Sequence, residues 1–204
     1  MKIIHVETLI DKGSYSQSVH WKQTREVIHN EVKAVDWTHG SGKFTIYPEP
    51  GKERGKGNGV VPIKKGLIER LTKAGWKPEE PLNIASRKRP GKLDAVLYSD
   101  HRPIALEWET GNISSSHRAL NKMCLGFIKG CLACGSLVVP SRRLYTFLTD
   151  RVGNYDELIP YLDFWKSIEC AVTNGVLEII VIEHDEESFD VPKIPKGTDG
   201  RALA

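Results

Sequence analysis

Residues 93–109 read LDAVLYSDHRPIALEWE, and this pattern is typical of two short paired strands. The apolar segments Leu93–Tyr98 and Ile104–Glu109 flank the turn-rich sequence Ser-Asp-His-Arg-Pro. Short apolar runs separated by turn-forming residues favour an antiparallel hairpin. We therefore expect residues 93–109 to form a hairpin whose strands carry three acidic side chains.

The acidic side chains of this hairpin are Asp94, Glu107 and Glu109. Alternate residues of a strand share a face, so Glu107 and Glu109 point the same way while Trp108 points into the core. Asp94 comes thirteen residues before Glu107, on the paired strand. Converging like charges repel unless a cation neutralises them, and Mg²⁺ prefers carboxylate oxygens as ligands. The pattern favours a metal site that activates water, with a solvated acidic strand face as the alternative.

Outside the hairpin, hydrophobic spacing predicts further helices and strands. The expected helices cover residues 16–35, 62–74, 114–129, 141–149 and 155–166, and the expected strands cover residues 44–47, 137–139 and 176–183. This mixed order predicts an α/β domain with a mixed sheet. We expect one domain over residues 1–204, with an extended tail over residues 190–204.

The composition is that of an ordinary globular protein. The 204 residues are 40% hydrophobic and 27% charged, which excludes a disordered or collagen-like chain. No apolar run approaches the roughly 18 residues of a membrane span. The short apolar N-terminus does not resemble a signal peptide. We therefore expect a cytoplasmic protein with no membrane partner.

Two of the four cysteines form the pair Cys131-Leu-Ala-Cys134. A zinc site would need a second Cys or His pair with suitable spacing, and none lies nearby in the sequence. A redox pair would place its first cysteine at a helix start, whereas Cys131 follows an expected helix end. The spacing therefore favours small residues entering a buried strand over a metal or redox site.

Positive charge is concentrated in residues 52–92, which hold twelve Lys or Arg and four Glu, although the whole chain carries only +3. Such a concentration suits a polyanion such as nucleic acid, or is simply solvated surface. The segment GKERGKGNG, residues 51–59, is expected to form a flexible basic loop. It does not match a phosphate-cradling loop, because no Ser or Thr and helix follow its Gly-Lys at the required offset.

Four blocks of sequence resemble one known family. The block from Glu107 to Arg118 reads EWETGNISSSHR and is followed by Asn121-Lys-Met. It closely resembles the EFETGNISS.HR..NK block of the BamHI-type type II restriction endonucleases. Residues 58–64, 148–152 and 194–200 resemble three further blocks of that family in the same order. The chain looks like the short, OkrAI-like members, which lack the C-terminal helical arm.

This resemblance implies a PD-(D/E)xK restriction-endonuclease-like core, in which helices flank a mixed central β-sheet. Most of that superfamily has Lys at the last position of the motif. This sequence has Glu109 there, and the BamHI group also has Glu. By resemblance, Asp94 and Glu107 bridge the metal ions. Glu109 would ligate a metal and act as general base, and Glu79 would be the accessory acid near a second metal. The implied cofactor is Mg²⁺, with two ions per active site.

The resemblance also implies how DNA is read. The implied DNA-binding residues are Lys64, Asn112, Ser114, Arg118, Asp150, Arg151, Asp199 and Gly200. Lys64 and the basic region would contact phosphates, which contributes affinity that does not depend on the DNA sequence. Asp150 and Arg151 match a pair that reads G·C, because Arg can donate to guanine and Asp can accept from cytosine. On residue type alone, the alternative is a surface ion pair. Asp199-Gly200 resembles a minor-groove contact.

The function that the resemblance implies is Mg²⁺-dependent double-strand cleavage of DNA by a homodimer. The matching readout residues imply the palindrome GGATCC and 5′-phosphate ends. A palindrome read twice by one fold requires a two-fold dimer. Residues 116–129 and 155–166 are the dimer-interface candidates, with ordinary core packing as the alternative. The competing hypotheses are a non-catalytic DNA-binding protein on the same fold and a nuclease of different specificity. The three acids argue against the non-catalytic one, because they would repel phosphate.

Overall fold

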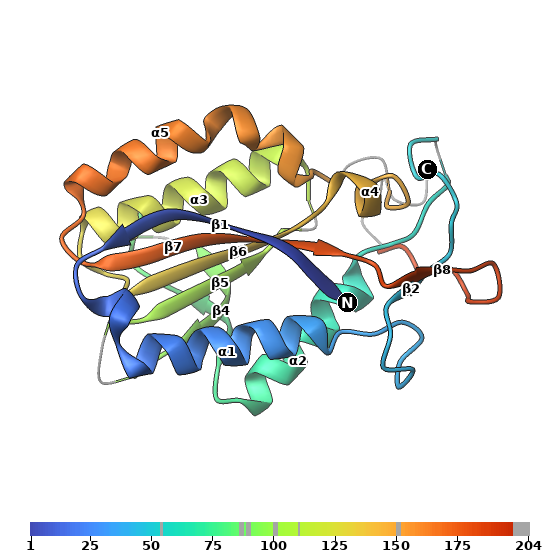
Figure 1. The fold of residues 1–204 in the computed structure, drawn as a ribbon, viewed down its shortest axis with the longest axis horizontal. Helices are drawn as coiled ribbons and strands as arrows, with labels where there is room; N and C mark the ends of the chain where they lie inside the picture. Colours follow the sequence, from blue (N-terminus) through green and yellow to red (C-terminus); the bar gives the residue numbers. More distant parts are fainter. Residues whose placement is uncertain are drawn as a thin grey trace.

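The computed structural model describes residues 1–53, 55–85, 88, 91–99, 102–109, 111–149 and 152–197. A six-stranded sheet with the order β1-β7-β6-β5-β4-β3 runs through its centre (Figure 1). Its strands are β1 (Lys2–Lys12), β3 (Lys77–Pro81), β4 (Lys92–Leu97), β5 (Ile104–Trp108), β6 (Cys134–Pro140) and β7 (Gly175–Glu183). β5, β6 and β7 are parallel, whereas β1, β4 and β3 pair antiparallel to their neighbours. The expected mixed sheet is therefore confirmed.

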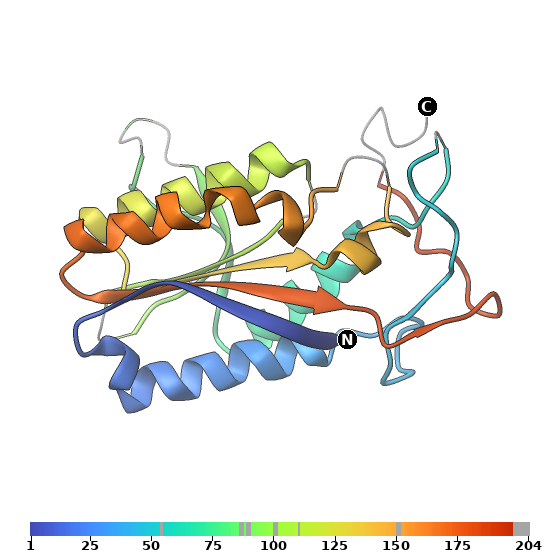
Figure 2. The same cartoon turned by 45° about the horizontal axis from the view of Figure 1, so that its top comes forward.

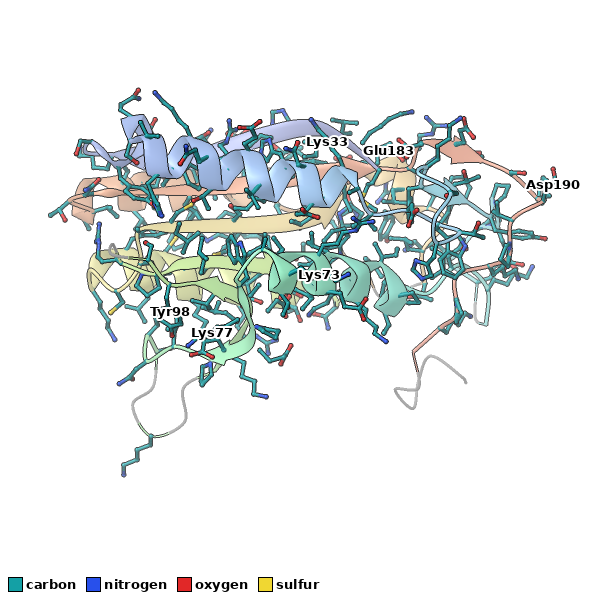
Figure 3. The ribbon with its side chains drawn as sticks, turned by 90° about the horizontal axis from the view of Figure 1, so that it is seen from below. Lys33, Lys73, Lys77, Tyr98, Glu183 and Asp190 are labelled. Atoms are coloured by element: carbon teal, nitrogen blue, oxygen red, sulfur yellow. The ribbon has the colours of Figure 1, made fainter. Side chains whose placement is uncertain are left out.

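Helices cover both faces of the sheet. α1 (Val19–Lys33) and α2 (Val61–Lys73) lie on one face, and Figure 3 looks onto that face. α3 (Ile113–Ile128) and α5 (Leu162–Ser167) lie side by side on the other (Figure 2). The chain also forms short 3₁₀ helices, η1 (Tyr15–Gln17), η2 (Tyr155–Glu157), η3 (Ile159–Tyr161) and η4 (Ile168–Ala171). None of the helices described is long and apolar enough to cross a bilayer.

A smaller unit lies at the end of the sheet toward which β6 and β7 point (Figure 1). It contains α4 (Arg142–Tyr145) and a two-stranded parallel sheet of β2 (Thr45–Ile46) and β8 (Glu186–Glu187). Ligands of open α/β sheets bind beyond the carboxyl ends of parallel strands. This end of the molecule is therefore where a functional site is expected.

The centre of the sheet forms because its strands are apolar on both faces. Every residue of β6 and β7 is buried, as is typical of parallel strands covered by helices on both sides. The hairpin expected over residues 93–109 is confirmed, because β4 and β5 pair antiparallel. Cys134 is the first residue of β6 and is buried with a free thiol. Cys131-Leu-Ala-Cys134 therefore leads into a buried strand, as the spacing favoured.

Two strands of the six-stranded sheet, β1 and β3, were not expected from the sequence. β1 pairs with β7 through two register shifts, between Ile3 and His5 and between Thr8 and Ile10. Such bulges break the two-residue alternation by which a strand is recognised. β3 has the sequence KPEEP, and its prolines are tolerated because it is an edge strand. Lys77 of β3 lies against the ring of Tyr98, with 4.9 Å between Nζ and the ring centroid (Figure 3).

The expected helices of the second half need correction. Residues 155–166 form η2, η3 and the first part of α5 instead of one helix, and Pro160 lies inside η3. Proline lacks a backbone N–H, so it cannot donate the hydrogen bond that one continuous α-helix would need at this position. The helix expected over residues 141–149 is limited to α4, with Ser141 as its N-cap. Residues 192–197 have no helix or strand.

Candidate active site

Three acidic residues occupy one row across the edge of the sheet. β4 and β5 pair Ala95 with Leu106, so the next step of the same register sets Asp94 opposite Glu107. β3 and β4 pair residues on either side of Glu79, which falls opposite Asp94. Glu79, Asp94 and Glu107 therefore follow one another across β3, β4 and β5.

Hydrogen bonds fix the two central carboxylates. The Trp108 N–H donates to Asp94 Oδ2 at 2.8 Å, and the Asp94 N–H donates to Glu107 Oε2 at 3.2 Å. These bonds between side chain and backbone lie next to Ala95 and Leu106, the last residue pair of the ladder between β4 and β5. Lys64 of α2 places its Nζ 2.5 Å from Asp94 Oδ1. Both oxygens of Asp94 are thus engaged, one by a backbone donor and one by an ammonium group.

Burial makes this an unusual environment for negative charge. Asp94 and Glu107 are each only 8% exposed. Burial, and then the charge of Asp94, raise the pKa of Glu107 to about 8. Burial and Asp94 also raise the pKa of Glu109, against the opposing effects of Lys64 and Arg118. In the metal-free protein at neutral pH, Glu107 consequently retains its proton to a large extent.

The acids line a cleft of about 870 Å³ together with the start of α3. Glu109 follows β5 directly, and its N–H donates to the Val138 carbonyl of β6 at 3.1 Å. Six predicted site residues line this cleft, namely Lys64, Asp94, Glu107, Glu109, Ser114 and Arg118. The structure thus brings predicted catalytic and DNA-binding residues together in one cleft.

Glu79 is placed differently from the other acids. It belongs to the row across the strands, but its side chain is exposed, and one carboxylate oxygen lies 3.9 Å from Lys92 Nζ. It does not line the cleft that holds Asp94 and Glu107. Its backbone has φ of +50°, which is uncommon outside glycine and recurs at functional sites.

Lys122 lines the same cleft, although the sequence pattern assigned it no role. Its Nζ donates to the carbonyls of Gly91 and Lys92 at 2.7 and 2.8 Å, which ties α3 to the start of β4. Burial lowers the pKa of Lys122, while Glu107 and Asp94 act in the opposite direction. The spacing of four residues from Arg118 on a helix could have indicated it, because such residues share a helix face.

The acidic side chains of the cleft have the chemistry, but not the arrangement, of a divalent-cation site. Within the described ranges, no three His, Cys, Asp or Glu side chains are arranged to hold an ion as they stand. The chemistry nevertheless fits, because buried carboxylate oxygens are ligands of hard cations. Lys64 already places one positive charge at Asp94, and Glu107 keeps a proton that a cation would replace. A metal ion would have to displace Lys64 and draw the carboxylates together.

The predicted base-reading residues fall into two groups. Asn112, Ser114 and Arg118 lie at the start of α3 and are exposed. Asn112 is the N-cap of α3, and its Oδ1 accepts from the Ser115 N–H at 3.3 Å. The predicted residues outside the described part of the chain are Asp150, Arg151, Asp199 and Gly200.

Comparisons with known proteins agree with this geometry. The protein-family model described as Restriction endonuclease BamHI matches residues 1–201. The chain belongs to the BamHI restriction endonuclease family. It is 44% identical over 203 residues to the type II restriction enzyme OkrAI of Oceanobacter kriegii, covering 100% of both chains. It is 36% identical over 185 residues to the type II restriction enzyme BamHI of Bacillus amyloliquefaciens, covering 84% of this chain and 81% of the relative.

Membership of the BamHI family confirms the resemblance and the enzyme class. Type II restriction enzymes are site-specific deoxyribonucleases, and they generally need divalent metal ions. The crystal structure of the restriction endonuclease BglII complexed with a DNA 16-mer has a similar fold, with a TM-score of 0.56. The match covers 91% of this chain and 79% of the BglII chain. Because the sequence identity is only 12%, the likeness shows the fold alone.

Proposed function

We propose that this BamHI-family enzyme cleaves both strands of DNA at the palindrome GGATCC, with Mg²⁺ as cofactor, and leaves 5′-phosphate ends. One observation carries the proposal: Asp94, Glu107 and Glu109 line the same cleft as Ser114 and Arg118. Acidic residues oppose DNA binding unless cations accompany them. A cleft that combines buried acids with exposed polar groups at a helix start suits hydrolysis of a bound phosphodiester. Because its substrate is DNA, we propose that the enzyme acts in the cytoplasm.

Asp94, Glu107 and Glu109 would hold the metal ions, with Glu79 as the accessory acid for the second of two. When bound, such ions lower the pKa of a water and stabilise charge on the leaving oxygen. Glu109 would accept the proton of the attacking water, because a raised pKa makes its carboxylate a stronger base. Lys64, once released from Asp94, would offer its ammonium group to the phosphate.

Sequence readout is assigned to two groups of residues. Asn112, Ser114 and Arg118 would contact base edges in the major groove. Asp150 and Arg151 would read a G·C pair, and Asp199-Gly200 would contact the minor groove. This assignment rests on the family blocks that contain these residues, together with the exposure of those at the start of α3.

A homodimer is supported by an exposed apolar surface near α5. Ile159, Tyr161 and Phe164 are 49%, 48% and 59% exposed. Contiguous apolar side chains on a surface mark an interaction site. His117 of α3 packs against Tyr161, with 4.5 Å between ring centroids, so α3 and this surface form one unit. We propose that two copies meet there and present one active site to each DNA strand.

The test is digestion of a plasmid that carries a single GGATCC site, with Mg²⁺ or with EDTA. A matched plasmid with one changed base pair and the variant D94N serve as controls. We expect linear product only from the wild-type protein with Mg²⁺ and the intact site, with ends that ligate directly. Cutting at other sequences would establish a nuclease of different specificity. Specific binding without cutting would establish a non-catalytic DNA-binding protein.

A further inference from the structure

Asn58 joins three segments of the chain that are distant in sequence. It is fully buried, and its Nδ2 donates to the carbonyls of Tyr47 and Phe147 at 2.8 and 3.0 Å. Its Oδ1 accepts from the Ile194 N–H at 3.1 Å. An amide side chain has two donors and one acceptor oxygen, so every polar group is used. We call Asn58 and these three partner residues the Asn58 clamp.

Backbone contacts strengthen the same junction. The Asn58 N–H donates to the Phe147 carbonyl at 2.8 Å, and the Thr149 N–H donates to the Asn58 carbonyl at 3.0 Å. The Gly59 N–H donates to the Ile194 carbonyl at 2.8 Å. A buried junction with this many satisfied bonds holds its segments in one arrangement.

Glycines allow the three segments to approach so closely. A Cβ on Gly51 would lie 1.6 Å from the Leu148 carbonyl oxygen, and a Cβ on Gly59 would lie 1.9 Å from the Pro195 carbonyl oxygen. Both distances are far inside van der Waals contact, so any side chain would push the backbones apart. Gly51 and Gly59 therefore allow this junction to form close backbone contacts that a side chain would prevent.

Two of the three clamped segments, those of Phe147 and Ile194, lead directly to proposed base-reading residues. Thr149 immediately precedes Asp150 and Arg151 in the chain. Beyond that pair, the Gly153 N–H donates to the Gly111 carbonyl at 2.9 Å, next to Asn112. Ile194 begins the block that contains Asp199-Gly200. The clamp thus fixes the starting point of two reading segments relative to each other.

We propose that Asn58 is a positioning residue for sequence readout, which sets the segments entering Asp150-Arg151 and Asp199-Gly200 in one register on the DNA. This inference rests on the proposed function, because it presumes that these residues read bases. Side chains that read bases must be held within fractions of an ångström, and buried hydrogen-bonded supports provide that precision. Asn58 itself is fully buried, so its side chain is out of reach of the bases of bound DNA.

The test compares N58D and N58A with the wild-type enzyme. N58D keeps an acceptor for the Ile194 N–H but loses the donors to the Tyr47 and Phe147 carbonyls. Discrimination is measured as the ratio of cleavage rates on GGATCC and on sites with one changed base pair. We expect it to fall at least about tenfold in both variants, the order of one lost base-pair discrimination. Affinity for non-specific DNA in EDTA and its salt dependence should stay unchanged.

The control N174A removes a hydrogen bond that the Asn174 side chain accepts from the Tyr15 N–H, far from the clamp in the sequence. It should discriminate as the wild type does, so an equal loss in N174A would overturn the inference. Unchanged discrimination in N58D would overturn it as well. If Asn58 variants do not fold, G59A provides the second test, because its Cβ would lie 1.9 Å from the Pro195 carbonyl oxygen and would displace the segment that Asn58 holds through Ile194. Normal discrimination in G59A would also contradict the inference. A wild-type enzyme that does not discriminate would instead refute the proposed function.

Discussion

Replacing Glu107 by Gln should remove most of the pH dependence of stability in the metal-free protein. The pKa of Glu107 is about 8 in the folded protein, against 4.5 for an ordinary glutamate. Between these pH values the folded protein holds a proton that the unfolded chain has released. Stability must therefore fall as the pH rises through this window, and the loss is complete above the folded-state pKa.

The size of this effect follows from the same pKa values. Each unit of pKa difference corresponds to about 1.4 kcal/mol, so the full difference between the two pKa values corresponds to about 5 kcal/mol of unfolding free energy. Gln at position 107 is neutral throughout and cannot contribute that loss. A smaller slope should remain in E107Q, because the pKa of Glu109 is raised too.

Urea unfolding in EDTA at several pH values between 5 and 8.5 measures this directly. The wild-type protein should lose stability relative to E107Q as the pH rises, by a few kcal/mol across the range. E69Q, which changes an exposed carboxylate of α2, should follow the wild type. Parallel curves for wild type and E107Q would refute the reasoning. A wild-type protein that becomes more stable relative to E107Q with rising pH would refute it as well.

Four further predictions concern the cation site, catalysis, readout and assembly. K64M should tighten binding of Ca²⁺ or Mn²⁺ measured by calorimetry, because Asp94 loses its competing ammonium group, and weaker binding would show that Lys64 supports the site. E109K should abolish cleavage while specific binding in gel shifts is retained, and an active variant would exclude Glu109 as the base. R151A should cost roughly 1–3 kcal/mol of sequence discrimination, whereas an equal loss on all sequences would indicate a phosphate contact. F164D should shift sedimentation toward the monomer, and an unaltered dimer would locate the interface elsewhere.

The active-site hairpin could be predicted because its signals are local. Alternation along β5 and the turn before Ile104 predicted that Asp94 and Glu107 come together, and their strands pair in that register. β1 could not be predicted, since its two register shifts break the alternation and its partner β7 lies far along the chain. β3 could not be predicted either, because its two prolines and two glutamates are residue types that are rare in strands.

Contacts between distant segments explain why the partners of Lys64 and Asn58 could not be predicted. Lys64 carries a charge typical of a phosphate contact, yet its ammonium group lies on Asp94, thirty residues later in the chain. Asn58 lies in a segment whose glycines and lysines suggested a flexible basic loop, whereas its side chain is fully buried and hydrogen-bonded to three other residues. Hydrogen-bond partners of this kind depend on the whole fold, so no local pattern indicates them.

The most direct test of the metal-dependent mechanism is anomalous diffraction from crystals of the protein bound to a GGATCC duplex in Mn²⁺. The expected result is manganese density between the carboxylates of Asp94, Glu107 and Glu109, beside a DNA phosphate, with Lys64 moved away from Asp94. DNA bound in the cleft with Lys64 still on Asp94 and no manganese at these carboxylates would contradict the mechanism.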